Sequence, residues 1–208
     1  SIKKKELFIA LKGEKFDGTS FVNVALKNGA IAAVVPKTFQ PENKKLIWVK
    51  DTLKALGDIA KNYRKEFSVY VIGITGSDGK TTTKEFLKKT LSMRYSVCGT
   101  EGNLNNAIGL PLSIFTINKK TDICILEMGM NRKNEIKYLG QIAKPQAGVI
   151  TTVGPAHIGF FKNVREIAEA KSELIETLRG ERLCVLNYDN RFFPFLKSKA
   201  PSKVLSFG

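Results

Sequence analysis

The sequence predicts an α/β protein, with a small N-terminal α/β domain over residues 1–67 and a second domain, 68–208, built on a mostly parallel sheet. Two observations support this fold class. From residue 69 onward, short apolar runs of strand type alternate with longer runs of helical period, as in successive β–α–β units. Ahead of that alternation, the first 67 residues hold a shorter set of strand and helix signals of their own.

Apolar runs and one helix-ending signal define the elements of the first domain. The pattern predicts strands at 7–11, 31–35 and 46–49, and helices at 21–26 and from 52 onward. The first helix should end at Asn28 and Gly29, because glycine commonly follows the last helical residue. In the second helix, Leu53, Leu56 and Ala60 keep the helical period.

Strands and helices alternate regularly through the second domain. The pattern predicts strands at 69–74, 121–126, 147–152 and 182–186, with helices at 81–93, 106–115, 134–143 and 164–178. Strands separated by helices of this length pair in parallel, with helices covering both faces of the sheet. Ligands bind beyond the carboxyl ends of the strands in such sheets, so we expect the functional side chains at that edge.

A glycine-rich turn joins the first of these strands to its helix. Residues 73–83 read Gly-Ile-Thr-Gly-Ser-Asp-Gly-Lys-Thr-Thr-Thr, and Ile74 stands where the common phosphate-loop pattern has its first glycine. The backbone N–H groups of such a turn and the positive end of the helix dipole attract phosphate. The predicted phosphate-binding residues are Gly76, Ser77, Asp78, Gly79, Lys80, Thr81 and Thr82. Lys80 should reach the outer phosphates, and the hydroxyl of Thr81 or Thr82 is a candidate Mg²⁺ ligand. The alternative is a turn without a ligand.

Composition excludes several other classes of protein. The chain has 43% hydrophobic and 25% charged residues, as globular proteins do, with no apolar run of membrane-spanning length and no visible signal peptide. Three cysteines, Cys98, Cys124 and Cys184, are odd in number and far apart in the sequence. We therefore expect reduced thiols in a cytoplasmic protein.

The net charge of +15 suggests nucleic acid as a partner at first sight. Residues 1–70 hold 14 basic and 7 acidic side chains, and residues 71–208 hold 20 and 12, so the excess is spread along the chain. It is mostly lysine, and aromatic residues do not interleave with it in a binding pattern. The sequence thus favours a generally basic surface over a nucleic-acid-binding face.

Three further charged or polar residues are candidates for the site. Glu127 closes an apolar strand and is placed either to hold Mg²⁺ or to be a solvated acid. His157, the single histidine, follows the next strand and is either a ligand at the same edge or an ordinary loop residue. Lys171 shares a helix face with Leu174, near the buried stripe, although a solvated lysine is the default on a helix.

Four motifs occur in an order that resembles the Mur ligase family. They are 76–83, 100–106 with Gly109 and Pro111, 127–129 and 154–157. The segment 7–18 is similar to the amino-terminal, UDP-binding domain of that family. The resemblance covers nearly the whole chain and implies a UDP-binding domain followed by a P-loop ATPase domain.

This resemblance implies an ATP-dependent, ADP-forming ligase. Family members join an amino acid or a dipeptide to a carboxylate of a UDP-muramoyl precursor, through an acyl phosphate that the incoming amine attacks. The motifs look most like the branch that adds D-alanyl-D-alanine to a UDP-N-acetylmuramoyl-tripeptide in peptidoglycan synthesis. Another Mur-type ligase, or a P-loop binding module without ligase chemistry, is the alternative.

The resemblance also implies roles for individual residues. Lys80 would stabilise the transferring phosphoryl group, Glu127 would complete a first Mg²⁺ site with Thr81 or Thr82, and His157 would bind a second Mg²⁺. Lys171 matches a family lysine that can be carbamylated into a metal ligand. Residues implied in binding are Asn103, Asn105 and Asn106 for substrate positioning, Asn187 on the nucleotide side, and Lys12, Gly13, Asp17 and Gly18 on the UDP side.

The chain departs from the family pattern at both ends and in the loop. Relatives in the family have a Ser-Arg pair linked to the UDP pocket ahead of the residue that matches Ser1, and an adenine-contacting segment and a third domain beyond the one that matches Gly208, so we expect the given chain to lack these parts. We therefore expect a chain of this extent to be inactive alone. Asp78 replaces the asparagine that is common in the loop. A monomer with no nucleic-acid partner and no membrane insertion is expected.

Overall fold

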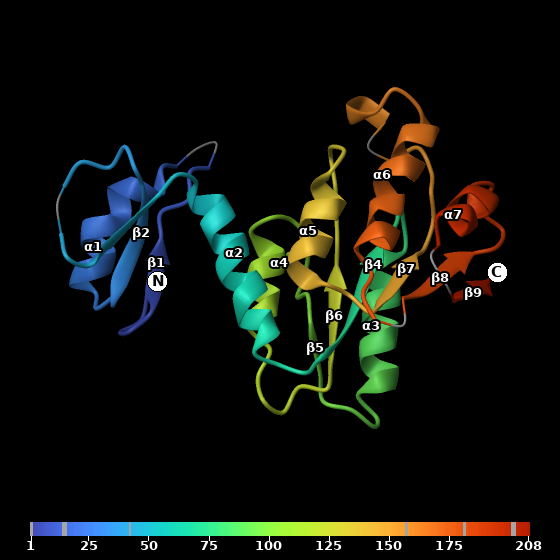
Figure 1. The fold of residues 1–208 in the computed structure, drawn as a ribbon, viewed down its shortest axis with the longest axis horizontal. Coiled ribbons are helices and arrows are strands. Elements are labelled where there is room, and N and C mark those ends of the chain that lie inside the picture. Colours follow the sequence, from blue (N-terminus) through green and yellow to red (C-terminus); the bar gives the residue numbers. More distant parts are fainter. Residues whose placement is uncertain (1, 14–15, 42, 157, 181, 201–202) are drawn as a thin grey trace. The chain divides into compact units, whose positions relative to one another are not determined.

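A computed structural model describes residues 2–13, 16–41, 43–156, 158–180, 182–200 and 203–208. The chain divides into two compact units, Ser1–Ile59 and Ala60–Gly208. Figure 1 shows the elements of each unit, coloured from blue at the N-terminus to red at the C-terminus.

The first unit is a three-stranded parallel sheet with a short helix. Its elements are β1 (Leu7–Ile9), η1 (Gly18–Phe21), α1 (Val22–Lys27), β2 (Ala32–Pro36) and β3 (Leu46–Val49), in the sheet order β1-β2-β3. Ala10, Val22, Ala33, Val35 and Leu46 form its small buried core. Helix α2 (Thr52–Lys65) begins in this unit and ends in the second.

The second unit contains a six-stranded sheet in which every neighbouring pair is parallel. Its strands are β4 (Tyr70–Thr75), β5 (Val97–Gly99), β6 (Ile123–Glu127), β7 (Ala147–Ile150), β8 (Leu183–Asn187) and β9 (Val204–Phe207), in the order β5-β6-β4-β7-β8-β9. Its helices are α3 (Lys80–Leu91), α4 (Gly109–Ile114), α5 (Glu135–Ala143), η2 (Ile158–Phe160), α6 (Val164–Thr177) and α7 (Phe193–Lys199). The carboxyl ends of β4, β6 and β7 therefore meet at one edge.

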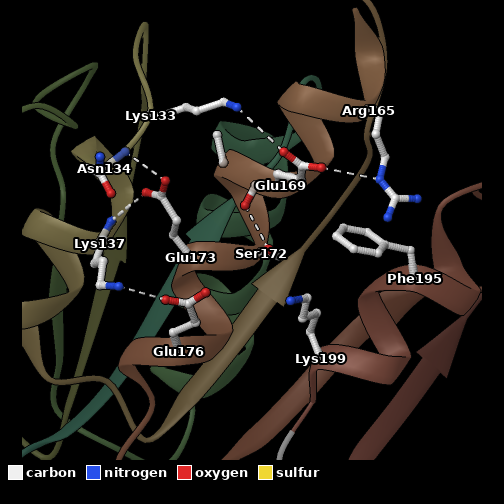
Figure 2. A pocket seen from close by; sticks show the side chains of 11 residues that line it. Lys133, Asn134, Lys137, Arg165, Glu169, Ser172, Glu173, Glu176, Phe195 and Lys199 are labelled. Atoms are coloured by element: carbon white, nitrogen blue, oxygen red, sulfur yellow. Dashed lines mark hydrogen bonds and ion pairs between the residues drawn. The ribbon is translucent and has the colours of Figure 1, made fainter.

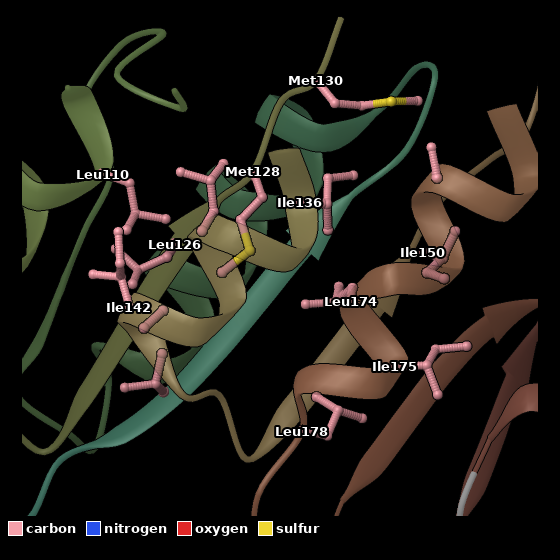
Figure 3. Close-up of a cluster of buried hydrophobic side chains, with 14 of the residues drawn as sticks. Leu110, Leu126, Met128, Met130, Ile136, Ile142, Ile150, Leu174, Ile175 and Leu178 are labelled. Carbon is pink, nitrogen blue, oxygen red and sulfur yellow. The ribbon is translucent and has the colours of Figure 1, made fainter. Parts of the chain in front are cut away.

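The period-two pattern of the strands assigns the helices to the two faces of this sheet. Cys124 and Leu126 of β6 belong to the large cluster that includes α4, α5 and α6, whereas Ile123 and Ile125 belong to the cluster against which α3 packs. Figure 3 shows the large cluster, in which side chains of α5 and α6 meet those of the sheet. Each fully buried aliphatic side chain of this kind contributes about 1.5–3 kcal/mol of burial free energy.

The second half of α2 is fixed to the second unit by Tyr63 and Arg64. The Tyr63 hydroxyl donates to the Ile117 carbonyl at 2.8 Å. The buried Arg64 guanidinium donates to the carbonyls of Ala143 at 3.0 Å and Val69 at 3.1 Å. One of these carbonyls ends α5 and the other lies just ahead of β4. Arg64 therefore supplies donors to carbonyl groups that need a partner from outside the regular hydrogen bonds of the helix and the sheet.

The predicted α/β class and mostly parallel sheet are confirmed, and most elements lie within two or three residues of their predicted ends. Strands β5 and β9 and helix α7 were not predicted, because runs of three to seven residues are too short for periodicity to establish. Helix α4 is shorter than its predicted range, 106–115. None of the helices in the described ranges has the length and apolarity needed to cross a bilayer.

Two of the three cysteines are closer in space than their sequence spacing suggests. All three are free thiols. Cys98 of β5 and Cys124 of β6 are register partners on neighbouring strands. A hydrogen bond with Cys124 lowers the pKa of the Cys98 thiol to about 7, while the same contact and burial raise the pKa of Cys124.

Candidate active site

The glycine-rich turn forms a loop between β4 and α3, as predicted. Gly79 precedes the helix with φ +79°, a left-handed conformation that favours glycine. At Gly76 a Cβ atom would collide with the Thr151 hydroxyl oxygen, so the loop can approach the end of β7 only with glycine there. The loop shape is therefore specified by two glycines of the predicted motif.

The segment that follows β7 holds this loop in place. The Ser77 N–H donates to the Thr152 carbonyl at 2.9 Å, and the Asp78 N–H donates to Thr152 Oγ1 at 2.9 Å. The Ser77 hydroxyl donates to the Gly154 carbonyl and accepts from the Gly154 N–H, at 3.1 and 2.9 Å. The sequence did not single out Thr151 or Thr152 individually, since nothing local distinguishes a threonine that buttresses a loop from one that ends a strand.

Lys80 folds back along the loop from the first turn of α3. Its ammonium group donates to the Gly76 carbonyl at 2.8 Å and to the Ser77 carbonyl at 3.2 Å. The cation is thus held against the predicted phosphate-binding turn, and its role at the outer phosphates stays a prediction.

Glu127 is the centre of the contacts at the end of β6. Its side chain is 97% buried. Oε2 accepts from Thr81 Oγ1 at 2.9 Å, and Oε1 accepts from the Asn105 amide at 2.8 Å. The backbone N–H of Glu127 donates to Thr100 Oγ1 at 3.0 Å. Two segments that were predicted separately, the glycine-rich loop and 100–106, therefore meet at this carboxylate.

A second charged group, Lys84, lies next to this carboxylate and was not predicted. It is 1% exposed, and its Nζ lies 4.0 Å from Glu127 Oε2. The same ammonium group donates to the Gly102 carbonyl at 3.2 Å and lies 3.2 Å from Glu85 Oε1. Its position one turn after Lys80 was the available signal, but exposed lysines are common on helices and no local pattern distinguishes this one.

Lys171 is buried in α6, with 1% of its surface exposed. The helical period had placed it near the buried stripe, and the structure confirms that placement over the default of a solvated lysine. Burial lowers the pKa of the Lys171 ammonium to about 7; the Lys80 charge acts in the same direction and Asp78 opposes it.

The remaining predicted residues of this unit have more local roles. The Asn106 side chain accepts from the backbone N–H of Ile108 and of Gly109 at 3.0 and 2.9 Å, and so caps α4. Asn187 accepts from the Asp189 N–H at 3.0 Å in the turn after β8. Asn103 is exposed, and within the described ranges no side-chain contact links Asn103 or Thr82 to Glu127. His157, predicted as a metal ligand, lies outside the described residues.

The four residues predicted on the UDP side gather in one turn of the first unit. Lys12 and Asp17 form an isolated antiparallel bridge, and the Gly13 N–H donates to the Phe16 carbonyl at 2.9 Å. Asp17 caps η1 by accepting from the Thr19 N–H at 2.9 Å, which is the main reason that its pKa is lowered. A Cβ at Gly18 would lie 2.6 Å from the Leu11 carbonyl oxygen, so this turn closes only with glycine.

The oxygen atoms at Glu127 and Thr81 suit a hard cation that is bound by few protein ligands. In the described part of the chain, no group of three or more His, Cys, Asp and Glu side chains could hold a metal ion. Mg²⁺ is commonly bound by one or two carboxylates together with substrate phosphates and water. The Glu127 carboxylate and the Thr81 hydroxyl, beside a phosphate loop, fit that pattern.

A concavity of about 330 Å³ lies among α5, α6 and α7 (Figure 2). Glu173 of α6 accepts there from the backbone N–H groups of Asn134 and Lys137 at 2.7 and 3.0 Å. Lys137 Nζ also donates to Glu176 at 3.0 Å. The lining residues differ from all the predicted site residues, and their contacts join α5 to α6.

Two family models match the chain. "Mur ligase middle domain" matches residues 74–208, and "Mur ligase family, catalytic domain" matches residues 1–64. The matches include the phosphate loop and Glu127 in the first case and the turn after β1 in the second.

Relatives of known name match over nearly the whole chain. The UDP-N-acetylmuramoyl-tripeptide–D-alanyl-D-alanine ligase of Bacillus subtilis is 41% identical over 100% of this chain, which covers 45% of the relative. The crystal structure of MurF from Acinetobacter baumannii has a TM-score of 0.93 and 33% identity, over 99% of this chain and 46% of that one. MurF ligase from Thermotoga maritima, solved in complex with ADP, has a TM-score of 0.92 and 36% identity, over 100% and 48%. The chain thus spans about half the length of these relatives.

Proposed function

Because the chain belongs to the Mur ligase family, we propose that it supplies the first part of an ATP-dependent, ADP-forming ligase that joins D-alanyl-D-alanine to a UDP-N-acetylmuramoyl-tripeptide. The observation that carries the proposal is the convergence of the glycine-rich loop and the segment 100–106 on Glu127, together with the relatives that bear this name. Residues 1–67 would bind the UDP precursor, and residues 68–208 would bind ATP.

The reaction requires two negatively charged reactants to meet. The precursor carboxylate attacks the γ-phosphorus of ATP, the bond to the β–γ bridging oxygen breaks, and ADP leaves with that electron pair. The amine of the dipeptide then attacks the acyl phosphate, loses a proton, and phosphate leaves from a tetrahedral intermediate. Both steps depend mainly on positioning and on cationic neutralisation.

The residues of this chain supply those two functions at the edge of the sheet. The loop N–H groups and Lys80 hold and neutralise the phosphates. Thr81 and Glu127 would hold Mg²⁺, which supplies Lewis-acid neutralisation of the phosphate oxygens when it is bound. Asn105 holds the other oxygen of Glu127, so the segment 100–106, which we propose positions the acceptor, is attached to the proposed metal carboxylate.

Lys171 has the properties that a carbamylation site needs, and we include its carbamylation in the proposal. A neutral amine attacks the carbon of CO₂ and loses one proton, giving a carbamate anion. The pKa of about 7 makes a large fraction of Lys171 neutral near pH 7, whereas an ordinary lysine is almost entirely protonated there. The carbamate would be an oxygen ligand in place of an ammonium group. A carbamate signal in ¹³C NMR spectra under ¹³CO₂ that is lost in Lys171→Met supports this assignment; equal spectra contradict it.

The ligase assignment is tested with the protein translated from the complete reading frame. It is incubated with ATP, Mg²⁺ and UDP-N-acetylmuramoyl-tripeptide plus D-alanyl-D-alanine, or with the UDP-N-acetylmuramoyl-dipeptide plus meso-diaminopimelate or lysine. Product mass and released phosphate are measured. Product only in the first mixture supports the proposal. Product only in the second identifies another Mur-type ligase, and ATP binding without any product identifies a binding module; either result overturns the assignment.

A further inference from the structure

The buried ammonium group of Lys84 contacts oxygens from three different parts of the second unit. One is the Gly102 carbonyl, which accepts a hydrogen bond at 3.2 Å. The others are Glu127 Oε2 at 4.0 Å and Glu85 Oε1 at 3.2 Å. The Glu85 side chain is 55% exposed, whereas those of Lys84 and Glu127 are 1% and 3% exposed.

Such burial makes a purely space-filling role a poor explanation for this side chain. Removing an ammonium group from water is costly unless hydrogen bonds and opposite charges compensate it. An apolar side chain would fill the same volume without that cost. The buried lysine is therefore best explained by the oxygens that its charge and its N–H groups bind, which belong to Gly102 and Glu127.

The Lys84 contacts tie a short segment to α3. Residues 100–106 contain Gly102 with φ +54°, a left-handed residue with no atom within 4 Å of a notional Cβ. Asn105 further along donates to Glu127, and its carbonyl accepts from the Gly129 N–H at 2.8 Å. The second half of the segment is thus attached to β6 by Asn105, and the first half to α3 by Lys84.

We infer that Lys84 is a positioning residue: through the Gly102 carbonyl and the Glu127 carboxylate it holds the segment 100–106 in the conformation that receives the acceptor precursor. This inference rests on the proposed function, since it takes the acceptor to be the UDP-precursor carboxylate. Lys84 is buried and acts through the segment and Glu127. Loss of Lys84 should weaken binding of the acceptor precursor. Nucleotide binding should persist, because Thr152 and Gly154 still hold the phosphate loop.

The first test measures the segment directly in the chain itself. Glu101 lies within the segment, so a glutamate-specific protease reports how readily the segment opens. Lys84→Met should accelerate cleavage after Glu101 by about fivefold or more, because local opening becomes easier. Lys89→Met, which removes an exposed lysine from the same helix, is the matched control and should leave cleavage unchanged. Equal cleavage in both variants overturns the inference whether or not the protein is a ligase.

The second test measures kinetics with the protein from the complete reading frame. Lys84→Met should raise the KM for the UDP precursor by about tenfold or more, as expected for the loss of charge-assisted contacts. The Kd for ADP, measured by calorimetry, should stay within about twofold of the parent value. Lys84→Arg, which keeps a cation and donors, should recover most of the acceptor KM. If Lys84→Met does not fold, Lys84→Gln, which retains a neutral donor, takes its place with the same expected direction.

The outcomes separate this inference from the proposed function. A structural role only is shown if Lys84→Met lowers the thermal midpoint but leaves the precursor KM, the ADP Kd and Glu101 cleavage unchanged. That result overturns the inference. Equal losses of acceptor and nucleotide affinity overturn it as well. An inactive parent protein contradicts the proposed function, and the protease test still decides whether Lys84 holds the segment.

Discussion

At the residue scale, the site is organised by buried charges that compensate one another. Glu127 accepts hydrogen bonds from Thr81 and Asn105, and the Lys84 ammonium group lies 4.0 Å from its Oε2. Lys171 is buried as well, and burial disfavours its charged form. A buried carboxylate with two donors and a nearby cation is stable before any metal arrives, because its charge is already partly neutralised.

Replacing Glu127 by Gln tests its role as a metal ligand. The amide keeps the size of the side chain and removes the negative charge, so Mg²⁺-dependent ATP turnover by the protein from the complete reading frame should fall by at least about 100-fold. The Kd for ADP in the absence of Mg²⁺, measured by calorimetry, should change little, because the loop and Lys80 remain. Turnover close to that of the parent would show that Glu127 is not a metal ligand.

Lys171 makes stability depend on pH in a defined direction. Its pKa is about 7 in the folded protein against 10.5 for an ordinary lysine, so between these values the unfolded chain binds more protons. The free energy of unfolding should therefore rise with pH from about 7 towards 10, by at most about 1.4 kcal/mol per pH unit from this one group. Lys171→Met should lose that contribution.

The measurement for Lys171 is urea unfolding followed by circular dichroism at pH 7, 8 and 9. Buffers are free of CO₂, nucleotide and Mg²⁺, so the amine stays unmodified. The difference in unfolding free energy between parent and Lys171→Met should change steadily with pH in favour of the parent. A difference that is independent of pH would contradict the burial of an ionisable amine.

At the element scale, the packing of α5 on α6 depends on a small residue. A Cβ on Gly140 of α5 would collide with the hydroxyl oxygen of Thr177 in α6. The same Cβ would lie 2.7 Å from the Cβ of Thr177. Glu173 of α6 joins the same two helices at the other end of α5 by accepting the N–H groups of Asn134 and Lys137. The two contacts fix the distance and the alignment of this helix pair.

Gly140→Ala should therefore destabilise the protein, although the same substitution inside an exposed helix usually stabilises it by about 1 kcal/mol. Overpacking against Thr177 should cost about 1–3 kcal/mol in the free energy of unfolding. Urea unfolding of Gly140→Ala is compared with that of Gln141→Ala, an exposed neighbour, which should stay within about 0.5 kcal/mol of the parent. An increase in stability for Gly140→Ala would show that the helices do not approach this closely.

The sequence could predict elements and motifs better than the contacts between them. Periodicity identified β4, β6, β7 and the helices between them, because amphipathic patterns reflect burial on one face. The loop 76–82 and Glu127 could be predicted because motif spacing and strand ends are local properties. The roles of Lys84 and Asn105 at Glu127 depend on segments about 20 residues apart or more, and no local pattern records that proximity.

At the scale of the whole molecule, the sequence carries a basic excess that would favour the anionic ligands of the proposed function. The net charge is +15, and both 1–70 and 71–208 contribute to it. A distributed positive potential raises the local concentration of polyanions without specific contacts, and salt screens it over about 10 Å at 0.1 M ionic strength.

The affinity for ADP should therefore weaken with ionic strength. Raising NaCl from about 0.05 M to about 0.5 M should increase the Kd several-fold, because both the long-range field and the exposed lysines are screened. Calorimetric titration at three salt concentrations measures this, with uncharged adenosine as the matched ligand. Equal salt dependence for both ligands would show that charge does not contribute to nucleotide binding.

The hydrogen bond from Thr81 to Glu127 also fixes the orientation of electron pairs. A hydroxyl group carries one hydrogen and two lone pairs. Because the hydrogen points at Glu127 Oε2, the lone pairs of Oγ1 are turned away from that carboxylate. The β-methyl group of threonine restricts rotation about χ1 and so fixes the position of Oγ1, while the hydrogen bond fixes the direction of the O–H group. An arriving cation therefore meets an oxygen that has already lost its rotational freedom, and serine in this position would offer the same atom with a larger entropy loss on binding.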